Sequence, residues 1–542
     1  MQLARWGLIA LAASTPGVII AQTPSPSLPT DKVSGQAPVS SFAVSTSLVV
    51  LDVVVTDAKG NIVRGLKKQD FTVLQDGKPQ SIRDFETWTE RPALPEQQAV
   101  DRFGRPDWGD TPLNIFVLDE LNTPFDEKAY SAAMLKKYLK AQPAQLPGPA
   151  MLVVVNDYGY RALQEYTRDR DVLIAKLDSR PPAIPSKLAR GANDVLLRQS
   201  FALLRQIALS ADGLREHKNI IWIGRGFPAL DPADLTDKSQ ASLQAAIQDT
   251  VTLLTAVRVT VFKVDPEATT TVLANTDPGA SLAVGAGTGG DNADLLAPGE
   301  DPLATNFNFN SFVVATGGHY YYGLNDLNRF IEDSVQQGTE FYTISYRPPP
   351  DNKDGVFRNI SIKMIPPGLT AQTRQGFYSS VGPRPEPTLD ELGFDLAQAA
   401  VSQMNYAGVS AIVTGLALSK TPGKVTVTFQ IEDRTLLWKQ ESTGGNTSDF
   451  MTVLVTLDAK HQIISSSAYK MHPLMAPADT ALLTTGLLTV RNDVAVNSKV
   501  RYLRVLVRDE TGRIGTADVD SEQLQTQIAK MTAAMIQHNS RR

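Results

Sequence analysis

The sequence predicts an α/β fold in which a mostly parallel sheet carries helices on both faces, with further β regions before and after it in the chain. The main observation is a set of short runs at 115–118, 151–155 and 219–223, which are apolar except for Asn219, with a last strand expected at 340–346. A strand that is buried on both faces of a parallel sheet needs no polar alternation, so runs of this kind are typical of such strands. Helical patterns at 126–140 and 239–256 supply the crossovers that parallel pairing requires.

The chain has 542 residues, too many for one hydrophobic core, and changes in composition divide it. Its first residues combine Arg5 with an apolar stretch that leads to Ala21, which is the pattern of an export signal. The expected segments are a signal peptide (1–21), a disordered linker (22–44), a small β domain (45–90), a second linker (91–110), the α/β domain (111–380) with a flexible insertion (267–308), a hinge and helix (381–403), a β-sandwich (404–520) and a C-terminal helix (521–542).

The two flanking β regions follow from runs of β-branched and apolar residues between turn signals. Residues 48–55 and 71–74 predict the small N-terminal unit. Between 404 and 520, repeated runs of this kind predict a sandwich that resembles immunoglobulin or fibronectin type III domains. The likeness concerns architecture alone, because the chain has no cysteine to form a sandwich disulfide.

Composition excludes several classes of site. Without cysteine there are no disulfides, thiolate zinc sites or cysteine nucleophiles, and the five histidines show no metal-ligand spacing. A net charge of -5 is small for this length and gives no reason to expect a nucleic-acid partner. No segment after the signal reaches the ~18 uninterrupted apolar residues that suggest a membrane span. We therefore expect an exported protein, in the periplasm or outside the cell, with no membrane span in its mature chain.

A polar cluster follows the first buried strand at Asp119, Glu120, Asn122 and Thr123. In open α/β sheets, ligands bind beyond the C-terminal ends of the strands, so this cluster is a candidate cation or ligand site. An equally open interpretation is a polar loop in which Asp119 or Thr123 accepts hydrogen bonds from backbone N–H groups near the start of the next helix.

The order of the predicted elements resembles a von Willebrand factor A (VWFA) domain, and the chain is more specifically similar to the exported VWFA-related proteins abundant in Acidobacteria. The resemblance covers residues 45–380 and implies a Rossmann-like VWFA domain. The motifs that carry it are Val-Val-Val-Thr-Asp (53–57) with Gly60, Gly65-Leu66 and Asp70-Phe71, Leu-Asp-Glu-Leu-Asn-Thr (118–123), Ala-Thr-Gly-Gly (315–318), Phe-Tyr-Thr-Ile-Ser-Tyr-Arg-Pro (341–348), Asp354-Gly355, Arg358-Asn359-Ile360 and Arg-Gln-Gly-Phe-Tyr (374–378).

The resemblance also implies where a metal would be bound. VWFA domains that bind ligands through a metal carry Asp-x-Ser-x-Ser after the first strand, a threonine in a second loop and an aspartate after the fourth strand. Here Asp119 and Thr123 match the first motif, but Leu121 replaces its first serine. The second loop, with Asn193 and Asp194, has no threonine.

After the fourth strand, Gly224 and Arg225 stand where the family has its aspartate. Because Mg²⁺ prefers near-octahedral oxygen ligands, the resemblance implies a degenerate metal-dependent adhesion site. A cation held by Asp119 and Thr123, with Asn122 as a substitute ligand, is expected to bind weakly. If Arg225 points into the crevice, it places a positive charge where the metal charge would lie. No other cofactor is expected.

The expected function is non-catalytic binding or adhesion to a protein or glycan at the cell envelope. The sequence has neither the Gly-x-Ser-x-Gly elbow nor the His-Glu-x-x-His metalloprotease motif. One alternative is an exported hydrolase that uses carboxylates such as Asp119, Glu120 and Asp265. Another is an envelope scaffold without a specific ligand. The expected ligand-binding residues are Asp119, Glu120, Asn122, Thr123, Asn193, Asp194, Gly224 and Arg225.

Overall fold

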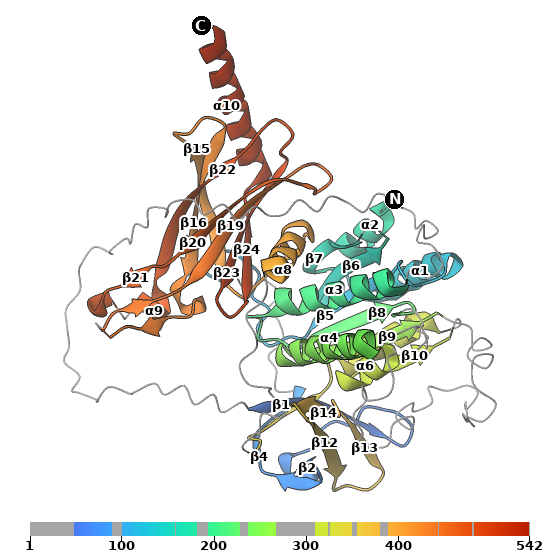
Figure 1. Cartoon of the computed structure of the whole chain (residues 1–542). Coiled ribbons are helices and arrows are strands. Elements are labelled where there is room, and N and C mark those ends of the chain that lie inside the picture. The colour runs from blue at the N-terminus through green and yellow to red at the C-terminus, as the bar shows by residue number, and fades with distance from the viewer. Residues whose placement is uncertain are drawn as a thin grey trace. The chain divides into compact units, whose positions relative to one another are not determined.

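The computed structural model divides the chain into two compact units (Figure 1). The first comprises Leu48–Thr388 and Ser402–Met404, and the second comprises Leu389–Val401 and Asn405–Arg542. The expected signal peptide, first linker and insertion 267–308 lie outside the described residues. The structure describes residues 48–88, 100–157, 159–181, 193–227, 237–266, 309–323, 326–349, 355–379, 389–442, 444–479 and 482–540.

A six-stranded, mostly parallel sheet forms the centre of the first unit, with the order β10-β9-β8-β5-β6-β7. Only β7 runs antiparallel, as the hairpin partner of β6 at the edge. Every residue of β5 and β8 is buried, which confirms that the uniform apolar runs are central strands. The strands are β5 (Leu113–Asp119), β6 (Gln145–Asn156), β7 (Gly159–Asp169), β8 (Lys218–Ile223), β9 (Val259–Asp265) and β10 (Tyr320–Tyr322).

Helices cover both faces of this sheet, and Figure 1 shows α3 and α4 lying in front of its strands. On one face, Leu135, Leu173 and Ile331 from three helices share a core with Phe116 and Ile221 of the strands. The other face is aromatic: the Trp222 and Phe309 rings, for example, have centroids 5.0 Å apart. The first face carries α1 (Phe125–Ala141), α2 (Arg170–Ser179) and α7 (Leu327–Gln337), and the second carries α3 (Asn193–Ala211), α4 (Asp237–Ala256) and α6 (Phe309–Ala315).

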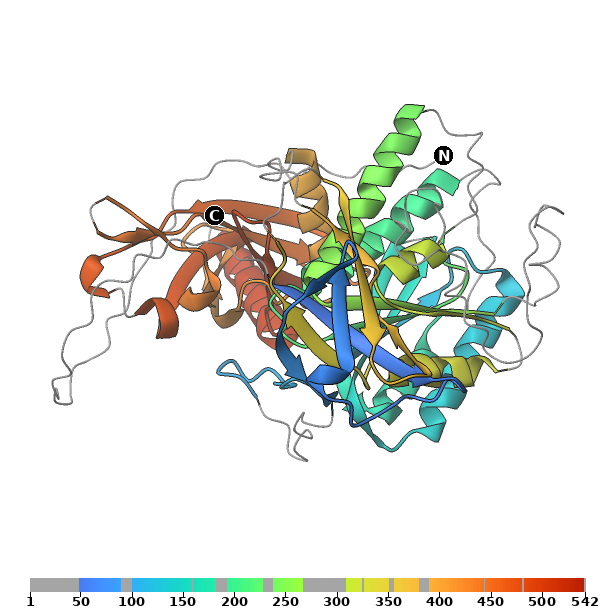
Figure 2. The ribbon, with the colours of Figure 1, turned by 90° about the horizontal axis from the view of Figure 1, so that it is seen from below.

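Two four-stranded antiparallel sheets, β13-β1-β11-β4 and β14-β12-β2-β3, complete the first unit around a core that includes Leu51 and Tyr342. Figure 2 shows their N-terminal strands (blue) beside strands from beyond residue 340 (gold). The elements are β1 (Val49–Asp57), η1 (Lys68–Asp70), β2 (Phe71–Gln75), β3 (Lys78–Gln80), β4 (Ile82–Glu86), β11 (Tyr342–Tyr346), β12 (Phe357–Met364), β13 (Leu369–Gln372) and β14 (Gly376–Tyr378).

The strand expected at 340–346 forms, but its placement in the α/β sheet was wrong. It is β11, which pairs antiparallel with β1 and β4. Its sequence alternates Tyr342, Ile344 and Tyr346, which enter the core, with the hydroxyl residues Thr343 and Ser345. This period of two is typical of an antiparallel strand with one packed face, whereas a central parallel strand is apolar throughout.

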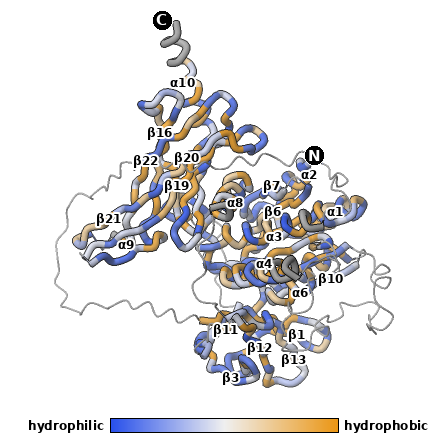
Figure 3. The backbone as a smooth tube through the Cα atoms, in the orientation of Figure 1, coloured by the Kyte–Doolittle hydropathy of each residue, from blue (hydrophilic) through white to orange (hydrophobic). Residues whose placement is uncertain are grey.

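In the second unit, the sheets β15-β16-β22 and β20-β19-β23-β24 share one core, to which Phe429, Leu454 and Val505 contribute. Figure 3 shows hydrophobic and hydrophilic residues interleaved along these strands. The strand β22 begins at Leu487, after the short helix α9 (Leu482–Thr485). The C-terminal helix packs Leu524 and Ile528 into the same core.

The remaining elements of this unit include a small sheet of the order β17-β18-β21. Among the helices described in either unit, none combines the length and apolar character needed to cross a membrane. The elements are α8 (Leu389–Val401), β15 (Ala411–Leu418), β16 (Lys424–Glu432), η5 (Asp433–Thr435), β17 (Lys439–Gln440), β18 (Asn446–Thr447), β19 (Phe450–Leu457), β20 (Ile463–Met471), β21 (Leu474–Met475), η6 (Pro477–Asp479), β22 (Leu487–Ala495), β23 (Tyr502–Asp509), β24 (Ile514–Asp518) and α10 (Ser521–Ser540).

Candidate functional site

The predicted site lies at the C-terminal edge of the six-stranded sheet, where the strand order reverses between β5 and β8. This reversal is the place where open α/β sheets form their ligand crevice. The two loops that follow these strands are in contact: the Arg225 N–H donates to Thr123 Oγ1 over 3.2 Å, and the Gly226 N–H donates to Asp119 Oδ2 over 2.9 Å. The structure therefore brings together the residues predicted from these two loops.

Asp119 ends β5 and is only 2% exposed, with both carboxylate oxygens engaged. Its Oδ1 accepts the N–H groups of Leu121 at 3.0 Å and Asn122 at 2.8 Å. Its Oδ2 accepts the Trp222 Nε1–H at 3.1 Å and the Gly226 N–H at 2.9 Å. Burial raises the pKa of Asp119, and these donors act in the opposite direction. This geometry matches the polar-loop interpretation for Asp119, whose main role here is to organise two backbone turns.

Gly224 shows how closely the two loops approach one another. Its φ of +144° lies in a region that L side chains rarely adopt. A Cβ at this position would stand 2.4 Å from Thr123 Oγ1 and 2.5 Å from Asp119 Cβ, inside normal contact distance. The glycine is therefore required by the packing of the β8 loop against the β5 loop.

Arg225 extends from the β8 loop and links two carboxylates. Its guanidinium donates from Nε and Nη2 to the two oxygens of Glu127, at 2.9 and 2.6 Å, and its Nε lies 3.5 Å from Asp265 Oδ1. The other oxygen of Asp265, at the end of β9, is 2.7 Å from Lys263 Nζ. Glu127 belongs to the first turn of α1. The result is a chain of alternating charges, Glu127–Arg225–Asp265–Lys263, which joins three neighbouring strand ends.

The residues at this edge do not fit Mg²⁺ well. A carboxylate offers about four lone-pair positions, and the four N–H donors on Asp119 occupy them. The Thr123 hydroxyl already accepts a backbone N–H. Of the three expected ligands, only Asn122 keeps a buried oxygen, Oδ1, without a hydrogen-bond partner among the described residues, while its Nδ2 donates to Ser200. The described part of the chain also contains no group of three or more His, Asp or Glu side chains that could hold a metal ion.

The other predicted residues are not among those that form the charged network of Glu127, Arg225, Asp265 and Lys263. Glu120 is buried, and its Oε1 accepts from Arg180 Nε at 3.1 Å, so its carboxylate belongs to a separate ion pair. Asn193 and Asp194 are the first two residues of α3, and their side chains lie outside the described residues. Sequence reasoning missed Glu127 and Lys263. A glutamate in a first helical turn is common, so no local signal distinguished Glu127.

No protein-family model and no curated protein matches this sequence. Among solved structures, the chain is similar to proximal thread matrix protein 1 of the mussel byssus, with 11% identity, 42% of this chain and 48% of that chain covered, and a TM-score of 0.25. The VWA domain of SpRpn10 gives 12% identity, 29% and 75% coverage and a TM-score of 0.19. The human COPII-coat protein Sec24c gives 11% identity, with 76% of this chain and 44% of that chain covered, and a TM-score of 0.23. The alignment thus spans about half of the mussel protein, and likeness at this level identifies neither a family nor a function.

Proposed function

We propose that this protein is an exported, non-catalytic binding protein of the VWFA-related type, which uses the C-terminal edge of its parallel sheet to bind a protein or glycan at the cell envelope without a metal ion. The observation that carries the proposal is the position of Arg225 between Glu127 and Asp265. A guanidinium there supplies positive charge at the edge where metal-dependent VWFA domains hold a cation. The N-terminal sequence, with the features of an export signal, supports the location.

The engagement of the carboxylates supports a non-catalytic role. A general acid or base must be able to reach a proton of the substrate. Asp119 is held by four N–H donors, Glu120 by Arg180, and Asp265 by Lys263 and Arg225. Each of the three carboxylates considered for hydrolysis thus already has a structural partner.

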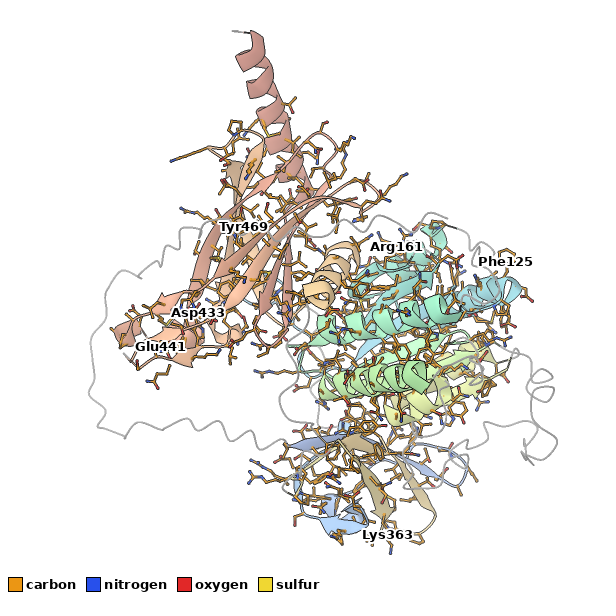
Figure 4. The ribbon with its side chains drawn as sticks, in the orientation of Figure 1. Phe125, Arg161, Lys363, Asp433, Glu441 and Tyr469 are labelled. Carbon is orange, nitrogen blue, oxygen red and sulfur yellow. The ribbon has the colours of Figure 1, made fainter. Side chains whose placement is uncertain are left out.

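An exposed aromatic side chain supports a binding role. Phe125, the first residue of α1, follows the β5 loop by two positions and is 52% exposed (Figure 4). Aromatic residues are enriched in protein interfaces, where they bury a large area at low entropic cost. We propose that Phe125 forms an apolar contact beside the charged network. For the second unit we propose an immunoglobulin- or fibronectin-like sandwich that acts as a spacer.

The proposal is tested by measuring binding of the mature full-length protein to arrays of envelope glycans and extracellular proteins, in Mg²⁺ and in EDTA. We expect binding that persists in EDTA and is weakened at least about tenfold by Phe125→Ser, as truncation of an anchoring aromatic usually does. The matched control is Phe394→Ser, at a phenylalanine of the second unit that is 45% exposed, and this variant should bind normally.

Three outcomes would contradict the proposal. Binding that disappears in EDTA would favour a working metal site at Asp119. Turnover of an array substrate that is lost in Asp119→Asn would favour the hydrolase. Absence of binding to every array member would favour a scaffold without a ligand.

A further inference from the structure

A polar hollow lies at the N-terminal end of the parallel sheet, opposite the candidate site and within the first unit. It is bounded by β1, by the residues just before β8 and β9, by the turn after α6, and by the segment between β13 and β14. Its interior measures about 30 Å³, about twice the space that one water needs. The lining residues are Val50, Asp52, His217, Thr255, Arg258, Val259, Thr260, Thr316, Gly317, Thr373 and Arg374.

The one carboxylate in this hollow is fully engaged. Asp52 Oδ1 accepts from Arg258 Nη2 at 2.7 Å and from the Thr343 hydroxyl at 3.1 Å, and its Oδ2 lies 2.6 Å from His217 Nδ1. His217 is 4% exposed, and its burial lowers its pKa, so that the imidazole is neutral near pH 7. Asp52 therefore forms its ion pair with Arg258, and the same carboxylate also acts electrostatically on Arg374.

Three donors that line the same hollow lack an acceptor among the described residues: Arg258 Nε, Arg374 Nε and the Thr373 hydroxyl. Arg374 makes one described hydrogen bond, from Nη2 to the Val50 carbonyl at 3.3 Å, and has no carboxylate partner in the described chain. A largely buried guanidinium without a direct ion-pair partner is costly. The Arg374 backbone packs closely against Gly317, where an added Cβ would stand 2.8 Å from the Arg374 amide nitrogen.

We propose that this hollow is a binding site for a small inorganic oxyanion of the phosphate or sulfate class, held by Arg374, Arg258 Nε and the Thr373 hydroxyl. A water molecule would accept hydrogen bonds from these donors but would add no negative charge to a hollow in which two guanidinium groups share one carboxylate. An oxyanion would accept hydrogen bonds from the free donors and would also supply negative charge. Its oxygens match the planar fork of a guanidinium. The size of the hollow favours a free ion over a larger molecule.

The site would join two parts of the first unit. Arg258 immediately precedes β9 of the parallel sheet, whereas Thr373 and Arg374 follow β13 of an antiparallel sheet. A ligand that binds the folded state alone stabilises it by mass action. The anion would therefore strengthen the contact between the six-stranded sheet and the smaller sheets, independently of the partner proposed for the other end.

The experiment is calorimetric titration of the mature full-length protein with inorganic phosphate, sulfate and glycerol 3-phosphate at constant ionic strength, with melting temperatures recorded in parallel. We expect stoichiometric binding of phosphate or sulfate, weaker binding of the ester, and a rise in melting temperature. Arg374→Met should lower the affinity at least tenfold and abolish the rise, and Arg374→Lys should restore part of both. The matched control is Arg83→Met, an exposed arginine on β4.

Each melting shift compares one variant with and without phosphate, so a less stable Arg374→Met still gives a clear answer. Crystals grown with selenate should show anomalous density between Arg258 and Arg374. The proposal is overturned if the wild-type protein gives no heat and no shift. It is equally overturned if the shift persists in Arg374→Met, or if crystals show water alone in the hollow.

Discussion

The two ends of the parallel sheet bury charge in different ways. At the C-terminal end, Asp119 is surrounded by four N–H donors, and Glu127, Arg225, Asp265 and Lys263 alternate in sign. At the N-terminal end, two arginines share a single carboxylate, and three donors remain without acceptors in the described chain.

The difference shows that the position of a cluster in a fold does not decide its chemistry. The C-terminal edge is where sheets of this order place their ligands, yet in this chain the ionic groups there already satisfy one another. Among the described residues, the N-terminal edge has a surplus of donors, which a ligand or water would satisfy. The balance of donors and acceptors, more than location, therefore distinguishes an edge that is closed to a small ion from a hollow that is poised to bind one.

The largest effect is expected from Gly224→Ala, which tests whether the C-terminal edge is closed. The new Cβ would overlap Thr123 and Asp119, so we expect a loss of about 4 kcal/mol in the free energy of unfolding. Urea unfolding followed by tryptophan fluorescence measures it. The control Gly368→Ala also has a positive φ, +76°, but opens onto empty space, and should lose only about 1–2 kcal/mol. Equal losses would mean that the loops can separate and that the edge is open.

Asp52→Asn should have the next largest effect, because it removes the one carboxylate that lines the hollow at the N-terminal end. We expect a loss of about 3 kcal/mol at pH 7, measured by urea unfolding. The exposed Asp178→Asn, which breaks a surface pair with Lys136, should lose less than about 1 kcal/mol. A similar loss of stability in both variants would mean that the Asp52 ion pair in the hollow contributes no more than an exposed ion pair.

The same variant should change the response to acid. Burial would raise the pKa of Asp52, but His217 and Arg258 outweigh it and hold this pKa well below its ordinary value. As the pH falls through the ordinary aspartate range, the unfolded state therefore binds a proton that the native state does not. The wild type should lose stability in this range. The Asp52→Asn variant should show a flatter profile, and an unchanged profile would contradict this assignment.

A moderate effect on the pH dependence of stability is expected from the ionisation of Lys218, which lies beside the hollow at the start of β8. Burial lowers its pKa from 10.5 to about 8, although Glu216 acts in the opposite direction. Between these two values the unfolded state carries one more proton than the native state, so stability should rise with pH, by up to ~3 kcal/mol. Chemical unfolding at pH 8 and pH 10 should show this rise, and Lys218→Met should remove it. Lys363→Met, at an exposed position on β12 (Figure 4), should leave it intact.

The smallest effect is the response of the wild type to Mg²⁺. Millimolar Mg²⁺ should change its melting temperature by less than about 1 °C, because four N–H groups occupy the Asp119 carboxylate and the Thr123 hydroxyl alone is a weak ligand. Arg225→Met leaves Glu127 and Asp265 without the guanidinium between them, so this variant should gain a Mg²⁺-dependent rise of several degrees. The control Arg329→Met, at an exposed position on α7, should behave as the wild type. A clear rise in the wild type would restore the metal hypothesis.

Much of the fold could be predicted because buried parallel strands have a local signature. The runs that lie within β5, β6 and β8 are almost entirely apolar, and no neighbour is needed to interpret them. The strand β11 was assigned to the wrong sheet, although its alternation of Tyr342, Ile344 and Tyr346 with polar residues favoured an antiparallel neighbour. Strand pairing joins residues far apart in sequence, here Val49 with Tyr346, and local patterns do not encode it.

Part of the candidate site could also be predicted from local patterns. Asp119, Thr123 and Arg225 could be named because each follows a predicted strand, and parallel strands end at one edge. Glu127 and Lys263 could not, since a first-turn glutamate and a lysine inside a strand have many ordinary roles. Arg374 entered the sequence analysis only within a motif of the resemblance, and its lack of a carboxylate partner becomes visible only in three dimensions.

The sequence by itself determined the type of each main element, the absence of cysteine chemistry and the edge at which polar residues would meet. These properties depend on composition and on periods of a few residues. Only the tertiary structure decided which donors meet which acceptors: that Asp119 is saturated, that Arg225 lies between two carboxylates, and that Arg374 forms no ion pair within the described residues. The physical reason is that hydrogen bonds and ion pairs act over about 3 Å, and contacts of that length between distant segments exist only after the chain has packed.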